Sequence, residues 1–204
     1  MIRVLVVATG NAGKMAEIRL ALAACGCDLV PWSEVSGGMD LHEDGETMYD
    51  NAVQKALAAA RHTGTPALAD DTGLVVDALD GRPGVRSARW AGAGAGPGER
   101  NRLLLTLMAP VPWPARQARF VCVAAVAWPD GRVVTGTGEL RGMLLREPQG
   151  GHGFGYDPLF WLPGYGCTLA ELEPAEKNII SHRGQALRAC FARVQVGESE
   201  GHGG

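Results

Sequence analysis

The sequence predicts an α/β protein built on a mixed β-sheet. Strand-like apolar runs alternate with helical segments in the first half of the chain, and an antiparallel hairpin follows in the second half. With 204 residues, 46% of them apolar, the chain can bury one sizeable core. We therefore expect a single domain, at most two-lobed, over residues 1–196. Residues 197–204 have too little apolar content to order themselves and predict a disordered tail.

The first half of the chain carries local signals for each of its elements. A β-branched run at 3–8 predicts a buried strand, and Met15, Ile18, Leu22 and Cys25 then follow at helical spacing. A capping box at Thr47-Met48-Tyr49-Asp50 predicts the start of an Ala-rich helix. The remaining expected segments are a strand at 29–32, an acidic loop at 40–46, the end of that helix near His62, and two short strands at 67–69 and 74–76.

The second half begins with a Gly-rich segment, 81–98, which predicts a flexible loop for which the sequence suggests no function. A Leu-rich helix follows near 100–108. The turn Pro129-Asp130-Gly131 separates apolar runs at 120–128 and 132–138, which is typical of a hairpin. The last helix is expected to begin after Ser181, acting as its N-cap.

Charge and cysteine content restrict the class of protein. The net charge of −3 lacks the basic excess of a protein that binds nucleic acid, so no nucleic-acid partner is expected. No apolar run approaches the roughly 20 residues that span a membrane. Five cysteines without a C-x-x-C pair predict reduced thiols rather than a zinc site or a disulfide framework. We therefore expect a cytoplasmic protein.

The first predicted strand leads into a helix through Thr9-Gly10-Asn11-Ala12-Gly13-Lys14. Backbone N–H groups and the positive end of the helix would converge there, which suits a phosphate. The glycine spacing and Met15, standing where a Mg²⁺-binding Ser or Thr is needed, argue against a P-loop kinase or GTPase. The alternative, a simple turn between strand and helix, stays open on this segment alone.

Asp70 and Asp71 follow an apolar strand, so we expect carboxylates at the exit of that strand. Two like charges there repel each other unless a cation joins them. Oxygen ligands without nearby His or Cys suit Mg²⁺ or Mn²⁺, and Glu43 in the acidic loop is a candidate further ligand. A solvated turn is the alternative for these two residues by themselves.

Two later clusters have the chemistry of base recognition. Gly153-Phe154-Gly155-Tyr156-Asp157-Pro158 offers aromatic rings for stacking and a carboxylate that accepts hydrogen bonds. Lys177 and the segment Ser181-His182-Arg183-Gly184 offer donors for a carbonyl oxygen or a phosphate. Local packing of the aromatic rings and a capped helix with exposed charges are the alternatives.

Taken together and in this order, the four clusters resemble the inosine/xanthosine triphosphate pyrophosphatase family over nearly the whole chain. The matching segments are T-G-N-x-x-K at Thr9–Lys14, A-D-D-[ST]-G-L at Ala69–Leu74, F-G-Y-D-P at Phe154–Pro158, and S-H-R-G-Q-A-L at Ser181–Leu187. Met48 and Asp50 depart from the family's T-F-x-E-N-A helix start, and His42 precedes Glu43 where a second acid is common.

The resemblance implies hydrolysis of the non-standard purine nucleotides ITP, dITP and XTP to a monophosphate and pyrophosphate, with Mg²⁺ as cofactor. It also implies an elongated mixed sheet, two lobes with a central cleft, and a homodimer. The substrate-binding residues that it implies are Thr9, Gly10, Asn11, Ala12, Gly13, Lys14, Thr72, Phe154, Gly155, Tyr156, Asp157, Lys177, His182 and Arg183.

On this basis the sequence suggests a mechanism. Lys14 and its loop would hold the triphosphate, while Mg²⁺ would bind Asp71 and Glu43. Asp71 is the candidate general base and Asp70 would help to order metal and water. Lys55, four residues after Asn51 on the predicted helix, would contact phosphate or an acidic ligand, unless it is an ordinary surface lysine. Lys177, His182 and Arg183 would donate to the 6-oxo group of the base, so that adenine is rejected.

Three other functions compete with this one. They are a nucleotide-binding sensor without hydrolysis, a pyrophosphatase for modified pyrimidine or 7-methylguanine nucleotides, and a phosphatase that releases inorganic phosphate. Paired acids argue against the sensor, because a protein that only binds a triphosphate gains little from negative charge beside it unless a metal is bound there for chemistry. The F-G-Y-D-P and S-H-R-G-Q-A-L segments favour the 6-oxopurine.

Basic residues are divided unevenly, with 16 arginines and only three lysines. The three lysines, Lys14, Lys55 and Lys177, all fall in the segments that the site uses. Compositional bias explains the arginines, whereas the positions of the lysines indicate places where a compact ammonium is needed.

Overall fold

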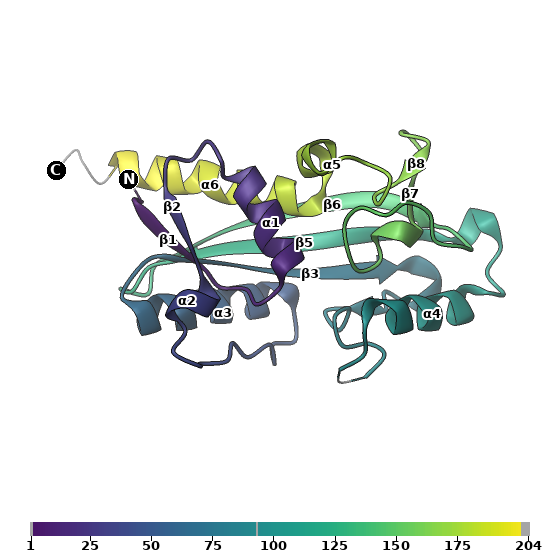
Figure 1. Ribbon diagram of the computed structural model, residues 1–204, viewed down its shortest axis with the longest axis horizontal. Coiled ribbons are helices and arrows are strands. Elements are labelled where there is room, and N and C mark those ends of the chain that lie inside the picture. The colour runs from purple at the N-terminus through teal and green to yellow at the C-terminus, as the bar shows by residue number, and fades with distance from the viewer. Residues whose placement is uncertain (1, 93, 201–204) are drawn as a thin grey trace. The chain divides into compact units, whose positions relative to one another are not determined.

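The computed structural model describes residues 2–92 and 94–200, and they form a mixed α/β fold (Figure 1). Its eight strands make one sheet in the order β2-β1-β3-β5-β6-β7-β8, with β4 paired to β3. The parallel pairs are β1–β2 and β1–β3, and the antiparallel pairs include β3–β4, β6–β7 and β7–β8. The mixed sheet predicted from the sequence is confirmed.

The chain divides into two compact units. Unit 1 comprises residues 1–71, 122–138 and 181–204, and unit 2 comprises residues 72–121 and 139–180. Strands β3, Ala67–Val76, β5, Gln117–Ala127, and β6, Val133–Leu144, contribute residues to both units.

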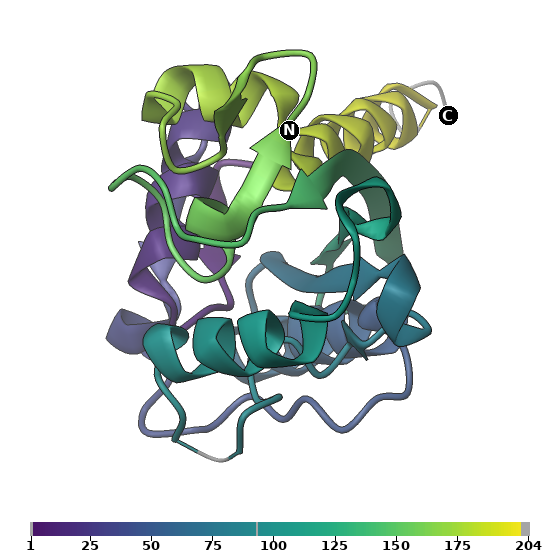
Figure 2. The same ribbon diagram turned by 90° about the vertical axis from the view of Figure 1, so that its right-hand side faces the viewer.

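Helices cover both faces of the strands in unit 1. Its own strands are β1, Val4–Val7, and β2, Asp28–Pro31; its helices are α1, Ala12–Ala21, α2, Trp32–Val35, α3, Met48–Thr63, and α6, His182–Glu200. Leu5 and Val7 pack with α1 and α6, whereas Val6 and Ala8 pack with α3. Because side chains alternate along a strand, β1 supplies two separate cores. Two perpendicular views show α3 on the side of the sheet opposite α1 and α6 (Figures 1 and 2).

Unit 2 has one core, to which α4, Pro97–Met108, contributes Leu104 and Met108. Its remaining elements are β4, Pro83–Gly84, β7, Phe160–Leu162, β8, Cys167–Thr168, and α5, Pro174–Ile180, together with the 3₁₀ turns Asp77–Leu79, Trp113–Ala115 and Asp157–Leu159. Among the described residues of the chain, no helix combines the length and apolar composition needed to cross a membrane.

Several local predictions are confirmed. The capping box opens α3, since Thr47 Oγ1 accepts from the Asp50 N–H at 3.1 Å and Asp50 Oδ2 accepts from the Thr47 N–H at 3.1 Å. Ser181 caps α6, because its Oγ accepts from the Gly184 N–H at 3.1 Å. The hairpin is present, with β5 and β6 neighbours in the sheet and the Trp128 N–H donating to the Arg132 carbonyl at 2.9 Å.

Helix α6 lies directly against β6, and two glycines make this possible. A Cβ at Gly136 would lie 2.3 Å from the Cys190 nitrogen, and one at Gly138 would lie 2.1 Å from the His182 carbonyl oxygen. Only a residue without a side chain fits at either position. The close approach brings the start of α6 to the strands that hold the candidate site.

Three expectations need correction. The runs at 67–69 and 74–76 are not two strands, because β3 continues through the polar residues between them. Helix α6 reaches Glu200, so it includes part of the predicted tail, of which residues 201–204 lie outside the described residues. Cys25 and Cys27 form a disulfide, whereas reduced thiols were predicted. The intervening Gly26 has a φ of +69°, a backbone conformation that lets cysteines at C-x-C spacing turn toward each other.

Candidate active site

The two adjacent acids lie inside β3 and point to opposite faces of the sheet in unit 1. Asp70 shares the face of Leu68, which packs with α1 and α6, and Asp71 shares the face of Ala69, which packs with α3. The expected position at a strand exit is therefore wrong. The alternation separates the two charges, so each acid has its own set of partners.

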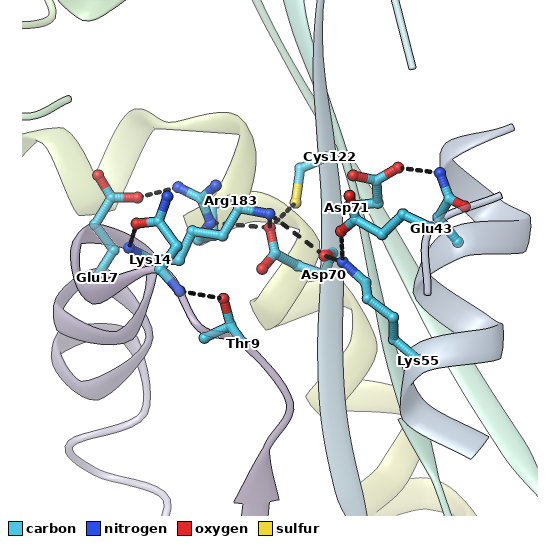
Figure 3. Close-up of polar contacts among 11 residues, drawn as sticks. Thr9, Lys14, Glu17, Glu43, Lys55, Asp70, Asp71, Cys122 and Arg183 are labelled. Atoms are coloured by element: carbon cyan, nitrogen blue, oxygen red, sulfur yellow. Dashed lines mark hydrogen bonds and ion pairs between the residues drawn. The ribbon is translucent and has the colours of Figure 1, made fainter. Parts of the chain in front are cut away.

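Asp70 is 1% exposed and sits among cations (Figure 3). Its Oδ2 lies 3.1 Å from Lys14 Nζ and 3.2 Å from Arg183 Nε, and the Cys122 Sγ lies 3.8 Å away. Burial alone would raise the pKa of Asp70, but Lys14, Arg183 and Lys55 outweigh it and hold that pKa well below its ordinary value. Asp70 is thus a permanently ionised anchor for basic side chains and a poor proton acceptor.

Arg183 also pairs with Glu17, which the sequence analysis did not identify. Glu17 lies one turn after Lys14 on α1, so the two ends of the Asp70 cluster come from one helix. Arg183 is 2% exposed, and its two carboxylate partners raise the pKa of the guanidinium despite burial. The signal for Glu17 in the sequence was its helical spacing from Lys14.

The pKa of Asp71 is shifted in the opposite direction from that of Asp70. Its Oδ2 accepts from Asn51 Nδ2 at 2.9 Å, and it is 5% exposed. Burial raises the pKa of Asp71, and the nearby Glu43 raises it further, against the Asn51 hydrogen bond and the charges of Lys55 and Lys14. A carboxylate with a raised pKa accepts a proton more readily, so Asp71 rather than Asp70 has the character of a general base.

Asn51 and Lys55 join the acidic loop to β3. Asn51 Oδ1 accepts from the Gly45 N–H at 2.8 Å, while Lys55 pairs with Glu43 and donates to the Asp70 carbonyl at 2.7 Å. Lys55 is 5% exposed, so it is not an ordinary surface lysine. Its partner, Glu43, is the residue of the 40–46 loop that the sequence predicts as a candidate metal ligand.

The Thr9–Lys14 segment has the expected form at the N-terminus of α1. Asn11 is the N-cap, and its Oδ1 accepts from the Lys14 N–H at 3.0 Å. Thr9 Oγ1 accepts from the Asn11 N–H at 3.2 Å, while Gly10, Asn11 and Ala12 are exposed. An exposed helix start with Lys14 beside it can bind an anion.

The predicted aromatic cluster lies in unit 2. Asp157 Oδ2 accepts from the Phe154 N–H at 2.8 Å and from Lys177 Nζ at 2.5 Å, and Lys177 Nζ lies 5.1 Å from the centre of the Phe154 ring. Gly153 has a φ of +74°, and a Cβ there would lie 2.3 Å from Asp157 Oδ2. The loop is thus shaped around the Asp157–Lys177 pair.

The structure distributes the predicted residues between the two units. Unit 1 brings together Thr9, Gly10, Asn11, Ala12, Gly13, Lys14, Glu43, Lys55, Asp70, Asp71, His182 and Arg183; unit 2 holds Thr72, Phe154, Gly155, Tyr156, Asp157 and Lys177. Arg183, predicted with the base-recognition residues, is paired within unit 1 to Asp70 and Glu17. Glu17, Asn51 and Cys122 were missed, because their roles depend on contacts between distant segments.

Comparison with known proteins identifies the family of this chain. The Ham1 family model matches residues 5–193. A dITP/XTP pyrophosphatase of Desulforamulus reducens is 52% identical over 187 residues, covering 92% of this chain and 93% of that protein. One of Geobacter sulfurreducens is 48% identical, covering 90% and 92%. The structure of a HAM1 protein from Coxiella burnetii superposes with a TM-score of 0.85 at 40% identity, covering 95% of this chain and 99% of that one.

The similarity covers nearly all of this chain and nearly all of its relatives, and it includes every segment that contributes to the candidate site. The chain belongs to the Ham1 family.

Proposed function

We propose that this protein hydrolyses ITP, dITP and XTP to the nucleoside monophosphate and pyrophosphate. The observation that carries the proposal is the placement of adjacent carboxylates on opposite faces of β3, with Asp70 against Lys14 and Arg183 and Asp71 against Asn51. Relatives that are 48–52% identical bear the name dITP/XTP pyrophosphatase, which supports this substrate class.

The carboxylates present fit a magnesium ion. Within the described part of the chain, no three acidic, His or Cys side chains gather to hold a metal, but Asp71 and Glu43 are close enough for Glu43 to raise the pKa of Asp71. Mg²⁺ in nucleotide sites is commonly held by one or two carboxylates together with substrate phosphates. When bound, it would neutralise phosphate charge and polarise the scissile bond.

Asp71 accepts the proton of the attacking water in this mechanism, because its pKa is the one that is raised. Asn51 orients the Asp71 carboxylate, and Lys55 holds Glu43. Lys14 and the exposed start of α1 bind the phosphates. Asp70 keeps Lys14 and Arg183 in place rather than taking part in proton transfer.

Selection of the base falls to Phe154, Asp157 and Lys177 of unit 2. Lys177 is 4% exposed, and its ammonium donates to Asp157 Oδ2 at 2.5 Å. A 6-oxo group can accept from such a donor, whereas the 6-amino group of adenine cannot. Sites of this kind discriminate by roughly 10⁴-fold, because the wrong base leaves buried groups unpaired.

The proposal is tested by incubating the protein with ITP and Mg²⁺ and measuring pyrophosphate and phosphate separately. We expect pyrophosphate with ITP and little turnover of ATP. Release of phosphate would indicate the phosphatase, and binding of ITP without turnover would indicate the sensor. A preference for modified pyrimidine or 7-methylguanine nucleotides would indicate the related pyrophosphatases.

Substitution of Asp71 tests its assigned role. Asp71→Asn keeps the shape and removes the proton acceptor, so we expect turnover to fall by at least about 100-fold while nucleotide still binds. The matched control is Asp77→Asn, which changes a half-exposed acid of unit 2 and is expected to keep wild-type turnover. Near-normal activity of Asp71→Asn would contradict the assignment.

The homodimer belongs to this proposal as a property implied by the resemblance, and the cytoplasmic location as one expected from the sequence. Light scattering of the purified protein measures the oligomeric state directly.

A further inference from the structure

The Gly-rich segment 81–98, without a role so far, has a buried attachment point at Ser87. Its side chain accepts from the Leu74 N–H of β3 at 2.8 Å and donates to the Gly84 carbonyl at 2.6 Å. Ser87 is 6% exposed. This part of the segment is therefore fastened to the sheet of unit 2.

Tyr156, in the candidate base loop 153–157, reaches this attachment point. Its hydroxyl donates to the Ser87 carbonyl at 3.0 Å, and Tyr156 as a whole is 5% exposed within the core of unit 2. The residues on either side of it, Gly155 and Asp157, belong to the same base loop. The contact fixes the middle of that loop to segment 81–98.

Helix α4 makes a second contact with the loop. Asn101 Nδ2 donates to the Gly155 carbonyl at 3.0 Å. One residue earlier, Arg100 donates to the carbonyls of Ala88, at 3.0 Å, and Ala95, at 2.7 Å. The first turn of α4 thus joins segment 81–98 to the peptide that precedes Tyr156.

These contacts matter because the loop backbone has little preference of its own. Gly153 and Gly155 have φ values of +74° and +65°, and glycine adopts many other conformations with equal ease. The conformation of residues 153–157 is therefore selected by the hydrogen bonds between Phe154 and Asp157 inside the loop together with contacts from outside it. Asn101 and the Tyr156 hydroxyl supply them on consecutive residues, beside the Phe154 N–H and the Asp157 carboxylate that shape the base site.

We propose that Asn101 and the Tyr156 hydroxyl are positioning groups that set base selectivity by holding the 153–157 loop to α4 and to segment 81–98. The inference rests on the proposed function, in which this loop recognises the base. It assigns specificity to residues that need not touch the nucleotide, and it gives the Gly-rich segment a role as their support.

The test is the kinetics of Asn101→Leu and Tyr156→Phe with ITP and ATP. Each change removes one hydrogen bond to the loop and keeps the approximate size of the side chain. We expect KM for ITP to rise about fivefold and the ITP/ATP ratio of kcat/KM to fall about fivefold, with kcat for ITP within about twofold of wild type. Controls are Thr106→Val on the exposed face of α4 and Tyr165→Phe at a tyrosine that is 57% exposed.

The outcomes separate this inference from the proposed function. Selectivity equal to that of the controls in both variants overturns the inference, as does a fall in kcat with an unchanged ITP/ATP ratio, which indicates a structural role only. Tyr156→Phe, which removes a single oxygen, decides the matter if Asn101→Leu does not fold. Absence of pyrophosphate release by the wild-type protein overturns the proposed function itself, whatever the variants do.

Discussion

Asn51 is a single side chain that joins two parts of the candidate site. It is fully buried. Its amide oxygen accepts from the Gly45 N–H of the acidic loop, and its amide nitrogen donates to Asp71 Oδ2. The Asp71 hydrogen bond favours the ionised carboxylate, while burial favours the neutral one. Asn51 therefore limits how far the pKa of Asp71 is raised and also fixes the direction in which its oxygens point.

We predict that Asn51→Leu lowers kcat by about 10- to 100-fold, the range usual for residues that orient a metal-binding carboxylate. The loss also leaves the part-buried Gly45 N–H without its acceptor, which costs about 1 kcal/mol of stability. Kinetics are measured well below the unfolding temperature of the variant. Gln54→Leu, on the exposed side of the same helix, is the control, and a wild-type kcat in Asn51→Leu would exclude the positioning role.

At the scale of elements, the main difference between prediction and structure is strand β3. Two adjacent acids followed by Thr-Gly have poor strand propensity, so local patterns indicate a turn. The structure keeps them in the strand because α1 and α6 bring cations to Asp70 and α3 brings an amide to Asp71. Those partners come from residues up to 113 positions away, a separation that no local pattern reports.

Arg116 fastens another junction, between α4, β5 and β6 in unit 2. It is 1% exposed and donates to the carbonyls of Met108 at 2.5 Å, Leu144 at 2.6 Å and Leu145 at 2.9 Å. A planar guanidinium can serve these acceptors at the same time, and it also lies at the negative end of α4.

We predict that Arg116→Lys lowers the free energy of unfolding by about 2–4 kcal/mol, because an ammonium cannot reach all three buried carbonyls. Arg146→Lys is the matched control, since this exposed arginine donates to the carbonyls of Ala109 and Val111, both at 3.2 Å. Its effect should stay below about 1 kcal/mol. Urea denaturation of both variants gives the comparison, and equal effects would contradict it.

Across the whole molecule, all three lysines pair with a carboxylate. The pairs are Lys14–Asp70, Lys55–Glu43 and Lys177–Asp157, and the lysine side chains are 15%, 6% and 5% exposed. Each lysine is therefore held in the structure by an acidic partner. Each ammonium sits in a confined space where a larger planar group would displace its neighbours.

We predict that Lys14→Arg, Lys55→Arg and Lys177→Arg each lower kcat/KM for ITP by at least about tenfold, since every one misplaces a site carboxylate. The control is the opposite exchange, Arg141→Lys, at a side chain that is 79% exposed. We expect it to leave kcat/KM for ITP unchanged. If all three variants kept full activity, the scarcity of lysine would reflect composition alone.

Stability at high pH depends on Tyr156. Burial raises the pKa of Tyr156 from 10.0 to about 12. Between these values the unfolded chain loses the phenol proton and the folded protein retains it, so the stabilisation present below pH 10 is lost as the pH approaches 12.

We predict that the stability difference between wild type and Tyr156→Phe is constant below pH 10. It should then decline by an amount on the order of 2 kcal/mol toward pH 12. Urea denaturation at a series of pH values measures it. A difference that stayed constant through this window would show that the phenol is not protected by the fold.

The sequence by itself determined most of the strands and helices and their order, because periodicity, caps and turn residues are local. It also predicted the mixed sheet, whereas the pairing of each lysine with an acid is seen only in the structure. Only the tertiary structure decided which of two adjacent acids stays ionised and which has a raised pKa. Strand alternation sends Asp70 toward Lys14 and Arg183 and Asp71 toward Asn51, and these opposite surroundings form only when α1, α3 and α6 pack on β3.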